Sequence, residues 1–239
     1  MHNWLERTVL LIGEEKLDIL KKSHVLVVGI GGVGAYAAEM LCRAGVGELT
    51  IVDSDVVSPS NRNRQLIALV STQGHEKTKI LAERLRDINP NIKLNVIHDY
   101  IHNEKTEVLL NRPYNYVVDA IDTLAPKVNL IRQCIEKGLP IISSMGAGAK
   151  LDPTKIEITD ISKSHHCPLA HQLRKRLNRI GIRKGFKVAF SSEIPISSAV
   201  QPCDDVMNKK SIVGTISYMP PIFGCMCAYA VIRDLIDKT

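Results

Sequence analysis

The first strong pattern in the chain is a continuous apolar run that ends in glycine, "HVLVVG" at residues 24–29. Such a run, without polar alternation, predicts a strand that is buried on both faces of a sheet. The next segment, 31–47, spaces its alanines and leucines as a helix does, and Gly45 stands near its end. A second apolar strand, "ELTIVD" at 48–53, completes a strand–helix–strand unit.

The alternation of strands and helices continues through the first half of the chain. An amphipathic helix is expected at 75–88, because the Asn89-Pro90 pair that follows ends a helix. The pattern predicts further strands and helices, in chain order, at 5–21 (helical), 92–100 (strand), 103–111 (helix), 114–122 (strand), 126–137 (helix) and 139–148 (strand). Strands that alternate with helices predict a mostly parallel, doubly wound sheet.

The pattern changes after Gly148. Strands are expected at 155–161 and 186–195, as parts of a smaller β element, with a basic helix between them at 168–185. An apolar helix follows the Pro220-Pro221 pair. We therefore expect an α/β protein with a doubly wound, mostly parallel, Rossmann-like sheet in residues 1–150, and a smaller C-terminal β/α subdomain in 151–239.

Composition narrows the class of protein. Apolar residues make up 45% of 239, which is typical of a globular chain, and the net charge is +6. This charge permits a polyanionic partner such as tRNA but does not require one. The longest apolar run, 222–232, is shorter than the roughly 20 residues that cross a bilayer, and no signal segment is apparent at the start. We expect a cytoplasmic protein without a membrane span, in which this run forms a buried helix.

The cysteines predict buried thiols in a reducing compartment rather than a metal site. None of them forms a C-x-x-C pair, so no structural zinc is expected. They stand at positions 42, 134, 167, 203, 225 and 227. His165, His166 and Cys167 are adjacent, and three adjacent residues rarely converge on one metal ion. Cys225 and Cys227 are expected in the core rather than in catalysis.

A glycine-rich turn lies between the first strand and its helix. Its glycines allow a tight turn and a close approach to a phosphate, which the N-terminus of the helix attracts. They are Gly29, Gly31, Gly32 and Gly34. Asp53 ends the second strand, about 20 residues on, where a carboxylate can accept hydrogen bonds from a ribose. These residues fit NAD, FAD or ATP equally well, and a tight turn without a ligand is the plainer alternative.

Three charged residues favour a triphosphate. Arg64 and Lys77 are expected in loops at the same sheet edge, and Asp122 is expected at the end of a strand. Cations neutralise phosphate oxygens, and an aspartate can hold the Mg²⁺ that bridges them, whereas hydride transfer gains nothing from this group. The alternative is that the three are unrelated surface charges.

Five ordered motifs together resemble one family. "GIGGVG", "VDSD", "SNRNRQ", "GHEK" and "DAID" are similar to the ubiquitin-activating-enzyme-like adenylating family that includes ThiF and MoeB. The resemblance implies that residues 1–150 form an ATP-binding core. It also implies a reaction in which a carboxylate becomes an acyl adenylate and pyrophosphate is lost.

The resemblance also implies roles for individual residues. Asp53 would hold the ribose, Asp122 would bind Mg²⁺, and Arg7, in "ERT", would reach the phosphates, often from the second subunit of a homodimer. The remaining residues expected to contact the nucleotide or its phosphates are Asp55, Asn61, Arg64, Gln65, Lys77 and Lys127. Arg62 could simply face solvent.

The second half resembles the tRNA threonylcarbamoyladenosine dehydratase branch, through "SSMGAG" and "LDPTKIEITDISKS". Enzymes of this branch activate the threonyl carboxylate of the modified adenosine, and the carbamoyl nitrogen then closes a ring. Cys167 stands where this branch carries an acidic residue. A basic run would contact tRNA phosphates, or would merely be a solvated helix face. It comprises Arg174, Lys175, Arg176, Arg179, Arg183, Lys184 and Lys187.

Two other classes of function remain open. An activator of a ubiquitin-like sulfur-carrier protein would form a thioester or acyl disulfide through a cysteine. A nucleotide-binding module or NAD enzyme would leave Arg64, Lys77 and Asp122 without a role. A sulfur-transfer protein is a further partner that some relatives have.

Overall fold

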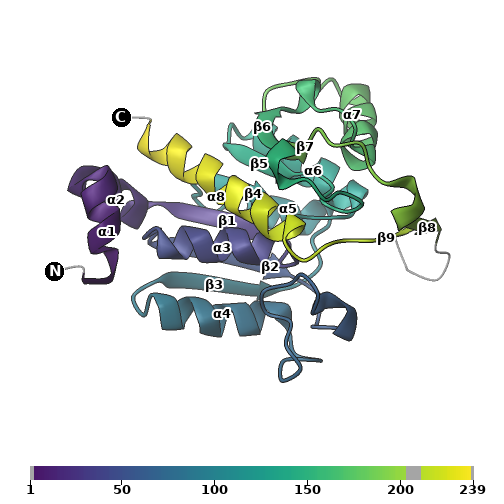
Figure 1. Ribbon diagram of the computed structural model, residues 1–239. Helices are drawn as coiled ribbons and strands as arrows, with labels where there is room; N and C mark the ends of the chain where they lie inside the picture. Colours follow the sequence, from purple (N-terminus) through teal and green to yellow (C-terminus); the bar gives the residue numbers. More distant parts are fainter. Residues whose placement is uncertain (1–2, 203–210, 238–239) are drawn as a thin grey trace.

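The protein is built on one seven-stranded sheet with the order β3-β2-β1-β4-β5-β7-β6 (Figure 1). A computed structural model describes residues 3–202 and 211–237 of the chain. All neighbouring strands are parallel except β6 and β7, which are antiparallel. The strands are β1 (His24–Val28), β2 (Glu48–Asp53), β3 (Lys93–His98), β4 (Tyr116–Asp119), β5 (Ile141–Ser144), β6 (Ile156–Asp160) and β7 (Lys187–Ser191).

Helices cover both faces of the sheet. One face is covered by α3, α4 and α8, and the other by α5, α6 and α7, while α1 and α2 lie at the end of the sheet where the parallel strands begin (Figure 1). The α-helices are α1 (Glu6–Ile12), α2 (Glu14–Lys22), α3 (Gly34–Arg43), α4 (Lys77–Ile88), α5 (Asn103–Leu109), α6 (Leu124–Glu136), α7 (Pro168–Arg179) and α8 (Met219–Ile236). Short 3-10 turns lie at Asn3–Leu5, Pro59–Asn61, Pro153–Lys155, Ile161–Lys163 and Ser197–Ala199.

The continuous apolar run of β1 serves two separate cores. Successive side chains of a strand point to opposite faces, so Val25 and Val27 pack under α3 and α8 while Leu26 and Val28 pack under α6. All four are almost completely buried. The prediction of a doubly wound, mostly parallel sheet is confirmed.

The structure corrects one expectation about the second half. The strands predicted for a smaller β element are β6 and β7, and they extend the central sheet, because β7 pairs in parallel with β5. The residues of β7, "KVAFS", are buried along nearly the whole strand, as those of an internal strand must be. A separate two-stranded ribbon is formed by β8 (Val200–Pro202) and β9 (Ser211–Val213).

The apolar helix near the end of the chain belongs to the core. By length and composition α8 could cross a membrane, but 56% of it is buried, and it lies along α3 (Figure 1). The contact is close: a Cβ on Gly224 would stand 2.4 Å from the carbonyl oxygen of Val33. The prediction of a buried helix is confirmed.

A buried ion pair fixes the loop that follows β4. The ammonium of Lys127, on α6, lies 2.9 Å from the carboxylate of Asp119, and neither side chain is exposed. Lys127 also donates to the carbonyl of Ile121, and the amide of Ile121 donates to Asp119. The hydroxyl of Ser143, on β5, donates to the same carboxylate at 2.6 Å. Strand, loop and helix are thereby held by one network.

A buried histidine lies at the opposite end of β1. Nδ1 of His24 is 3.0 Å from the carbonyl oxygen of Pro113, which can only accept, so this nitrogen carries the proton. Nε2 lies 2.8 Å from the hydroxyl of Thr50, which then donates to it. Burial lowers the pKa of His24, although the carboxylate of Glu48 partly opposes this.

We expect Lys127→Met to lower the free energy of unfolding by about 3–5 kcal/mol, because it leaves the Asp119 carboxylate buried and uncompensated. Urea unfolding monitored by circular dichroism measures this loss. The control is Asp119→Asn/Lys127→Met, which removes the charge but keeps an acceptor for Ile121. It should be more stable than Lys127→Met alone. A double variant that is as unstable as the single one would show that the charge does not matter.

We expect His24 to make the protein less stable as the solution becomes acidic. Its folded pKa lies below the ordinary value of 6.5, so the unfolded chain takes up a proton first as the pH falls. The stabilisation is present above about pH 6.5 and is lost as the pH falls below it. In urea titrations from pH 7.5 to 5.5, the stability advantage of the protein over His24→Gln should shrink. An advantage that stays constant or grows would contradict this.

Candidate nucleotide site

The glycine-rich turn lies where the chain reverses direction across the sheet. From β1 the chain runs outward to β2 and β3, and it then returns to pair β4 with the other side of β1. Ligands of open α/β sheets bind in the crevice at such a point, beyond the carboxyl ends of the strands. Gly29, with φ +91°, meets β4 here: a Cβ would stand 2.7 Å from the carbonyl oxygen of Ala120. A Cβ on Gly34 would overlap the carbonyl of Gly29, at 1.7 Å.

The middle of the turn is open on one side and bounded on the other. At Gly31 a Cβ would meet only the side-chain nitrogen of Gln65, 3.8 Å away. At Gly32 it would stand 2.9 Å from Pro220 and 3.5 Å from the side chain of Arg64. The turn therefore presents backbone amides beside Gln65 and Arg64, with the first turn of α8 as a wall.

One buried polar atom at this turn lacks a partner. Gln65 is 9% exposed, and its side-chain oxygen, Oε1, accepts no hydrogen bond from any described residue. Unsatisfied buried polar groups are rare and often mark a place that a ligand or water completes. Together with the open backbone at Gly31, this atom fits a polar ligand such as a nucleotide at the turn.

Asp53 links the glycine turn to the end of β2. One carboxylate oxygen accepts from the backbone amide of Ile30 at 2.5 Å, and the other accepts from the amide of Asp55 at 2.7 Å. Burial raises the pKa of Asp53, while the ammonium of Lys77 and the two amides oppose the rise. Each oxygen keeps capacity for a further donor, such as a ribose hydroxyl.

Lys77 lies in the same cluster. It is the first residue of α4 and only 4% exposed, so it lies within the helix expected at 75–88 and not in a loop. Its ammonium lies 2.8 Å from the carboxylate of Asp55, and its backbone amide donates to the carbonyl of the same residue. The carboxylate of Asp55 holds the cation in place next to Asp53.

The polar segment "SNRNRQ" is held by its own hydrogen bonds. The side chain of Asn61 accepts from the amide of Ser58, and Arg64 donates from one nitrogen to the carbonyl of Ser60 at 3.0 Å and to Asn63 at 2.8 Å. The side-chain amide of Asn63 donates to the carbonyl of Thr215, near the start of α8. A guanidinium has five N–H donors, so Arg64 keeps others for a ligand. Arg62 is exposed, as expected.

Asp122 lies on the loop that the buried network holds. It is exposed and stands three residues beyond the end of β4, rather than at the strand end as expected. Lys127, expected at the nucleotide, is instead fully buried against Asp119. Asp119 is the residue that sequence reasoning missed. The motif "DAID" contained both aspartates, but the predicted strand was three residues too long and directed attention to the second one.

Arg7 is not brought to this cluster within one chain. It lies on α1, at the end of the sheet opposite the glycine turn (Figure 1). Leu5, two residues before it, lies close to Gly45, which precedes β2: a Cβ on Gly45 would stand 3.1 Å from that leucine. Arg7 itself is exposed.

The basic run divides into bound and exposed residues. Arg174 donates to the carbonyl and hydroxyl of Ser164, and Lys187, on β7, pairs with Asp234 of α8 at 2.5 Å. The rest lie on the outer side of α7 and the turn that follows it. These exposed residues are Lys175, Arg176, Arg179, Arg183 and Lys184.

The histidines and cysteines do not gather around a metal. Among residues 3–202 and 211–237, no three His, Cys, Asp or Glu side chains are arranged to hold an ion. Cys167 is buried and caps α7, where its sulfur accepts from the amide of Ala170. Cys203 lies outside the described residues.

Of the two cysteines expected in the core, only Cys227 lies there, and burial raises its pKa to about 12. Cys225 is exposed. The helix is apolar almost all round, so its sequence alone could not tell the two faces apart.

Comparison with known proteins places the chain among adenylating proteins. The tRNA threonylcarbamoyladenosine dehydratase of Bacillus subtilis is 39% identical over 243 residues, which cover 99% of this chain and 96% of that protein. The Haemophilus influenzae protein of the same name is 42% identical over 94% of this chain and 90% of its own length. The solved structure of the E. coli tRNA N6-threonylcarbamoyladenosine dehydratase in complex with ATP superposes with a TM-score of 0.91. It is 33% identical and covers 99% of this chain and 95% of its own.

The model of the ThiF family matches residues 5–239, which include the glycine turn, the "SNRNRQ" segment, α7 and α8. The match therefore covers both halves of the chain. The chain belongs to the ThiF family.

Proposed function

We propose that this protein is an ATP-dependent tRNA threonylcarbamoyladenosine dehydratase, which adenylates the threonyl carboxylate and allows the carbamoyl nitrogen to close the ring. The observation that carries the proposal is the agreement with an ATP-bound dehydratase over 99% of the chain. The cluster at the glycine turn supports it, because this cluster unites open backbone amides, an unsatisfied Gln65 and two cations.

The chain's own residues meet the electrostatic demand of this reaction. A carboxylate that approaches a phosphate brings two anions together, and nearby cations reduce that repulsion. In our proposal, Arg64 contacts the phosphates with its free N–H groups, Lys77 adds a fixed ammonium, and Asn61 adds an amide. Asp53 and Asp55 orient the ribose side. ATP supplies the electrophilic phosphorus and the pyrophosphate leaving group.

Asp122 is the proposed Mg²⁺ ligand. Mg²⁺ binds through one or two carboxylates together with substrate phosphates, and an exposed aspartate on a rigid loop suits this role. Lys127 acts through Asp119 and the backbone of Ile121, so we assign it to the support of this loop instead of to direct contact with the nucleotide.

The exposed basic residues of α7 and its following turn are the proposed tRNA contacts. Lysine and arginine on one outer surface bind phosphates without regard to sequence, and such binding weakens as salt increases. Arg174 and Lys187 are held by partners within the chain, so they contribute less than the other five.

We further propose that two copies of the chain share each site. Arg7 can reach the phosphates only from another copy, because it lies at the far end of the sheet in its own chain. On the same helix Leu10 and Leu11 are 80% and 84% exposed, and Trp4, just before it, is 46% exposed. Apolar side chains so exposed are consistent with a face that a second copy covers.

The alternative, an activator of a sulfur-carrier protein, is less well supported. The similarity to dehydratases extends over nearly the whole chain, including residues 151–239. Desolvation raises the pKa of both Cys225 and Cys227, which disfavours the thiolate that a thioester requires. A cytoplasmic location, a sulfur-transfer partner and a boundary near residue 150 stay predictions.

We expect Arg64→Ala and Asp122→Ala each to lower the rate of AMP release with modified tRNA on the order of 10²–10³-fold, by analogy with the loss of one transition-state donor. The rate is measured with radiolabelled ATP and saturating tRNA. Arg62→Ala, a matched change in the same exposed segment, should stay within about twofold. If either site variant kept the full rate, its assignment to the site would be wrong.

We expect Arg7→Ala and Asp122→Ala, each inactive alone, to regain about a quarter of normal activity when they are unfolded and refolded together. Random pairing makes half of the dimers mixed, and each mixed dimer has one intact site of two. The control mixture, Arg64→Ala with Asp122→Ala, should stay inactive, because both changes affect residues that one chain supplies. Equal recovery in both mixtures, or recovery in neither, would contradict the sharing of Arg7.

A further inference from the structure

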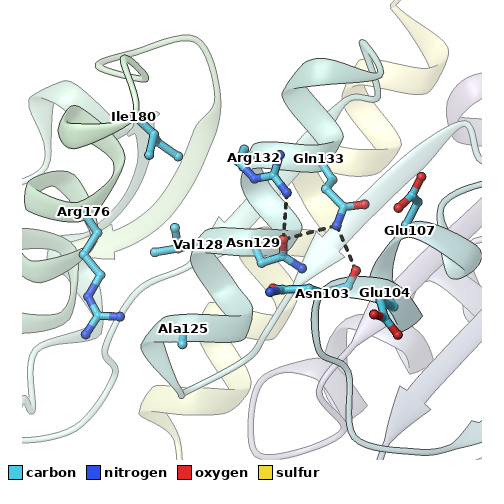
Figure 2. A pocket seen from close by; sticks show the side chains of 10 residues that line it. All are labelled: Asn103, Glu104, Glu107, Ala125, Val128, Asn129, Arg132, Gln133, Arg176 and Ile180. Carbon is cyan, nitrogen blue, oxygen red and sulfur yellow. Dashed lines mark hydrogen bonds between the residues drawn. The ribbon is translucent and has the colours of Figure 1, made fainter.

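A second hollow lies away from the glycine turn, between α5, α6 and α7 (Figure 2). Its volume is about 400 Å³, within the range of small-molecule sites. Ala125, Val128 and Ile180 supply apolar walls, and the other lining side chains are polar or charged. We call it the α5–α7 pocket. The adenylation reaction assigns no task to these residues.

The floor of the pocket holds two amides in fixed orientations (Figure 2). Arg132 donates to the side-chain oxygen of Asn129, and Gln133 donates its NH₂ group to the same oxygen and to the carbonyl of Asn103. Reversing either amide would set donor against donor or acceptor against acceptor. This leaves the nitrogen of Asn129 and the oxygen of Gln133 without partners among the described residues, although the two side chains are only 7% and 6% exposed.

The rim carries unpaired charges of both signs. Glu104 and Glu107 stand on the α5 side and Arg176 on the α7 side (Figure 2). In the described part of the chain none of the three has an ion pair or a side-chain hydrogen bond. Arg132, by contrast, is committed to Glu136 and Asn129. A ligand that spans this rim needs a hydrogen-bond donor at one end and an anion at the other.

A nucleotide has this pattern when its base carries an exocyclic amine. Carboxylates accept from the amine of cytosine, and arginine binds the phosphate. RNA is recognised largely through unpaired bases that are turned out of their stack. The position is suitable too, because Ala125 follows Asp122 by three residues and Arg176 belongs to the exposed basic surface of α7.

We propose that the α5–α7 pocket binds an unpaired, amine-bearing base of the substrate RNA, with the base amine on Glu104 or Glu107 and an RNA phosphate on Arg176. The proposal rests on the proposed function, in which a modified tRNA is the substrate. The pocket then fixes a second nucleotide of that RNA while the modified one lies at the glycine turn. It would give the enzyme a preference for loop sequence that the basic surface alone cannot supply.

The proposal predicts the direction in which the loss of two negative charges changes RNA affinity. Removing negative charge beside a polyanion ordinarily strengthens binding. The pocket predicts the opposite: Glu104→Gln/Glu107→Gln should bind a hairpin RNA that carries threonylcarbamoyladenosine in its loop on the order of tenfold more weakly. Fluorescence anisotropy at one fixed salt concentration measures the affinity. Binding that is unchanged or tighter overturns the inference.

Matched variants separate the pocket from general electrostatics. Glu83→Gln, at an exposed position of α4, removes the same kind of charge elsewhere and should not weaken binding. Arg176→Gln and Arg179→Gln remove equal charges from one helix, but only Arg176 lines the pocket. Arg176→Gln should lose more affinity, and equal losses would count against the pocket. Both glutamates are exposed, so their replacement should leave the fold intact, as circular dichroism can verify.

A second measurement uses the unaltered protein. Loop nucleotides of the hairpin are replaced by abasic sites one at a time. At one position the replacement should weaken binding to the unaltered protein. The RNA affinity of the unaltered protein should then equal that of Glu104→Gln/Glu107→Gln. If no position does so, the inference falls. Release of AMP by the unaltered protein is followed in parallel. If the hairpin elicits none, the proposed function fails; if it does and the glutamate variant binds normally, only the pocket assignment fails.

Titration with free nucleotides tests whether the pocket binds a base within RNA or a free nucleotide. With ATP saturating the first site, cytidine monophosphate and uridine monophosphate are titrated while the side-chain amide NMR signals of Asn129 and Gln133 are followed. The hairpin should move these signals, and cytidine monophosphate should move them more than uridine monophosphate, which lacks the amine. If a free nucleotide moves them and the hairpin does not, the site serves a free nucleotide and the RNA assignment is wrong.

Discussion

The closeness of β1 and β4 at their carboxyl ends is the constraint on which the site depends. The turn after β1 passes so near Ala120 that no side chain fits at Gly29, and the turn folds back on itself so tightly that none fits at Gly34. Just beyond this contact, the buried pair of Asp119 and Lys127 fixes the loop that carries Asp122. Contacts within the chain therefore bring the backbone of two strands together, which limits the reorganisation that binding would require.

The charged groups of the site are held in place by oppositely charged or polar groups of the same chain. Lys77 is fixed by Asp55, Asp53 by two backbone amides, and Arg64 by the segment around it. Preorganised charges are effective because they need not reorient when the substrate's charge develops. An acidic residue beside the proposed phosphate site has the same use, because Asp55 positions the cation of Lys77.

The fold and the glycine turn could be predicted because both follow short-range patterns. The apolar run of β1, the glycine turn and the "SNRNRQ" segment lie close together in the chain, so their spacing predicts their geometry. Features that depend on how separate elements pack against one another could not be predicted in this way. The addition of β6 and β7 to the main sheet depends on contacts with β5, more than forty residues from β7. The burial of Lys127 depends on how α6 packs against the end of β4, where Asp119 lies, and nothing in the local sequence distinguishes this residue from a surface lysine.

The first and last parts of the chain meet at the glycine turn. Pro220 stands against Gly32, and Gly224 lies against Val33. The helix α8 therefore forms one wall beside the glycine turn of residues 29–34. A substitution that displaces the start of α8 would therefore also change the shape of the glycine turn, although the two segments are far apart in the sequence.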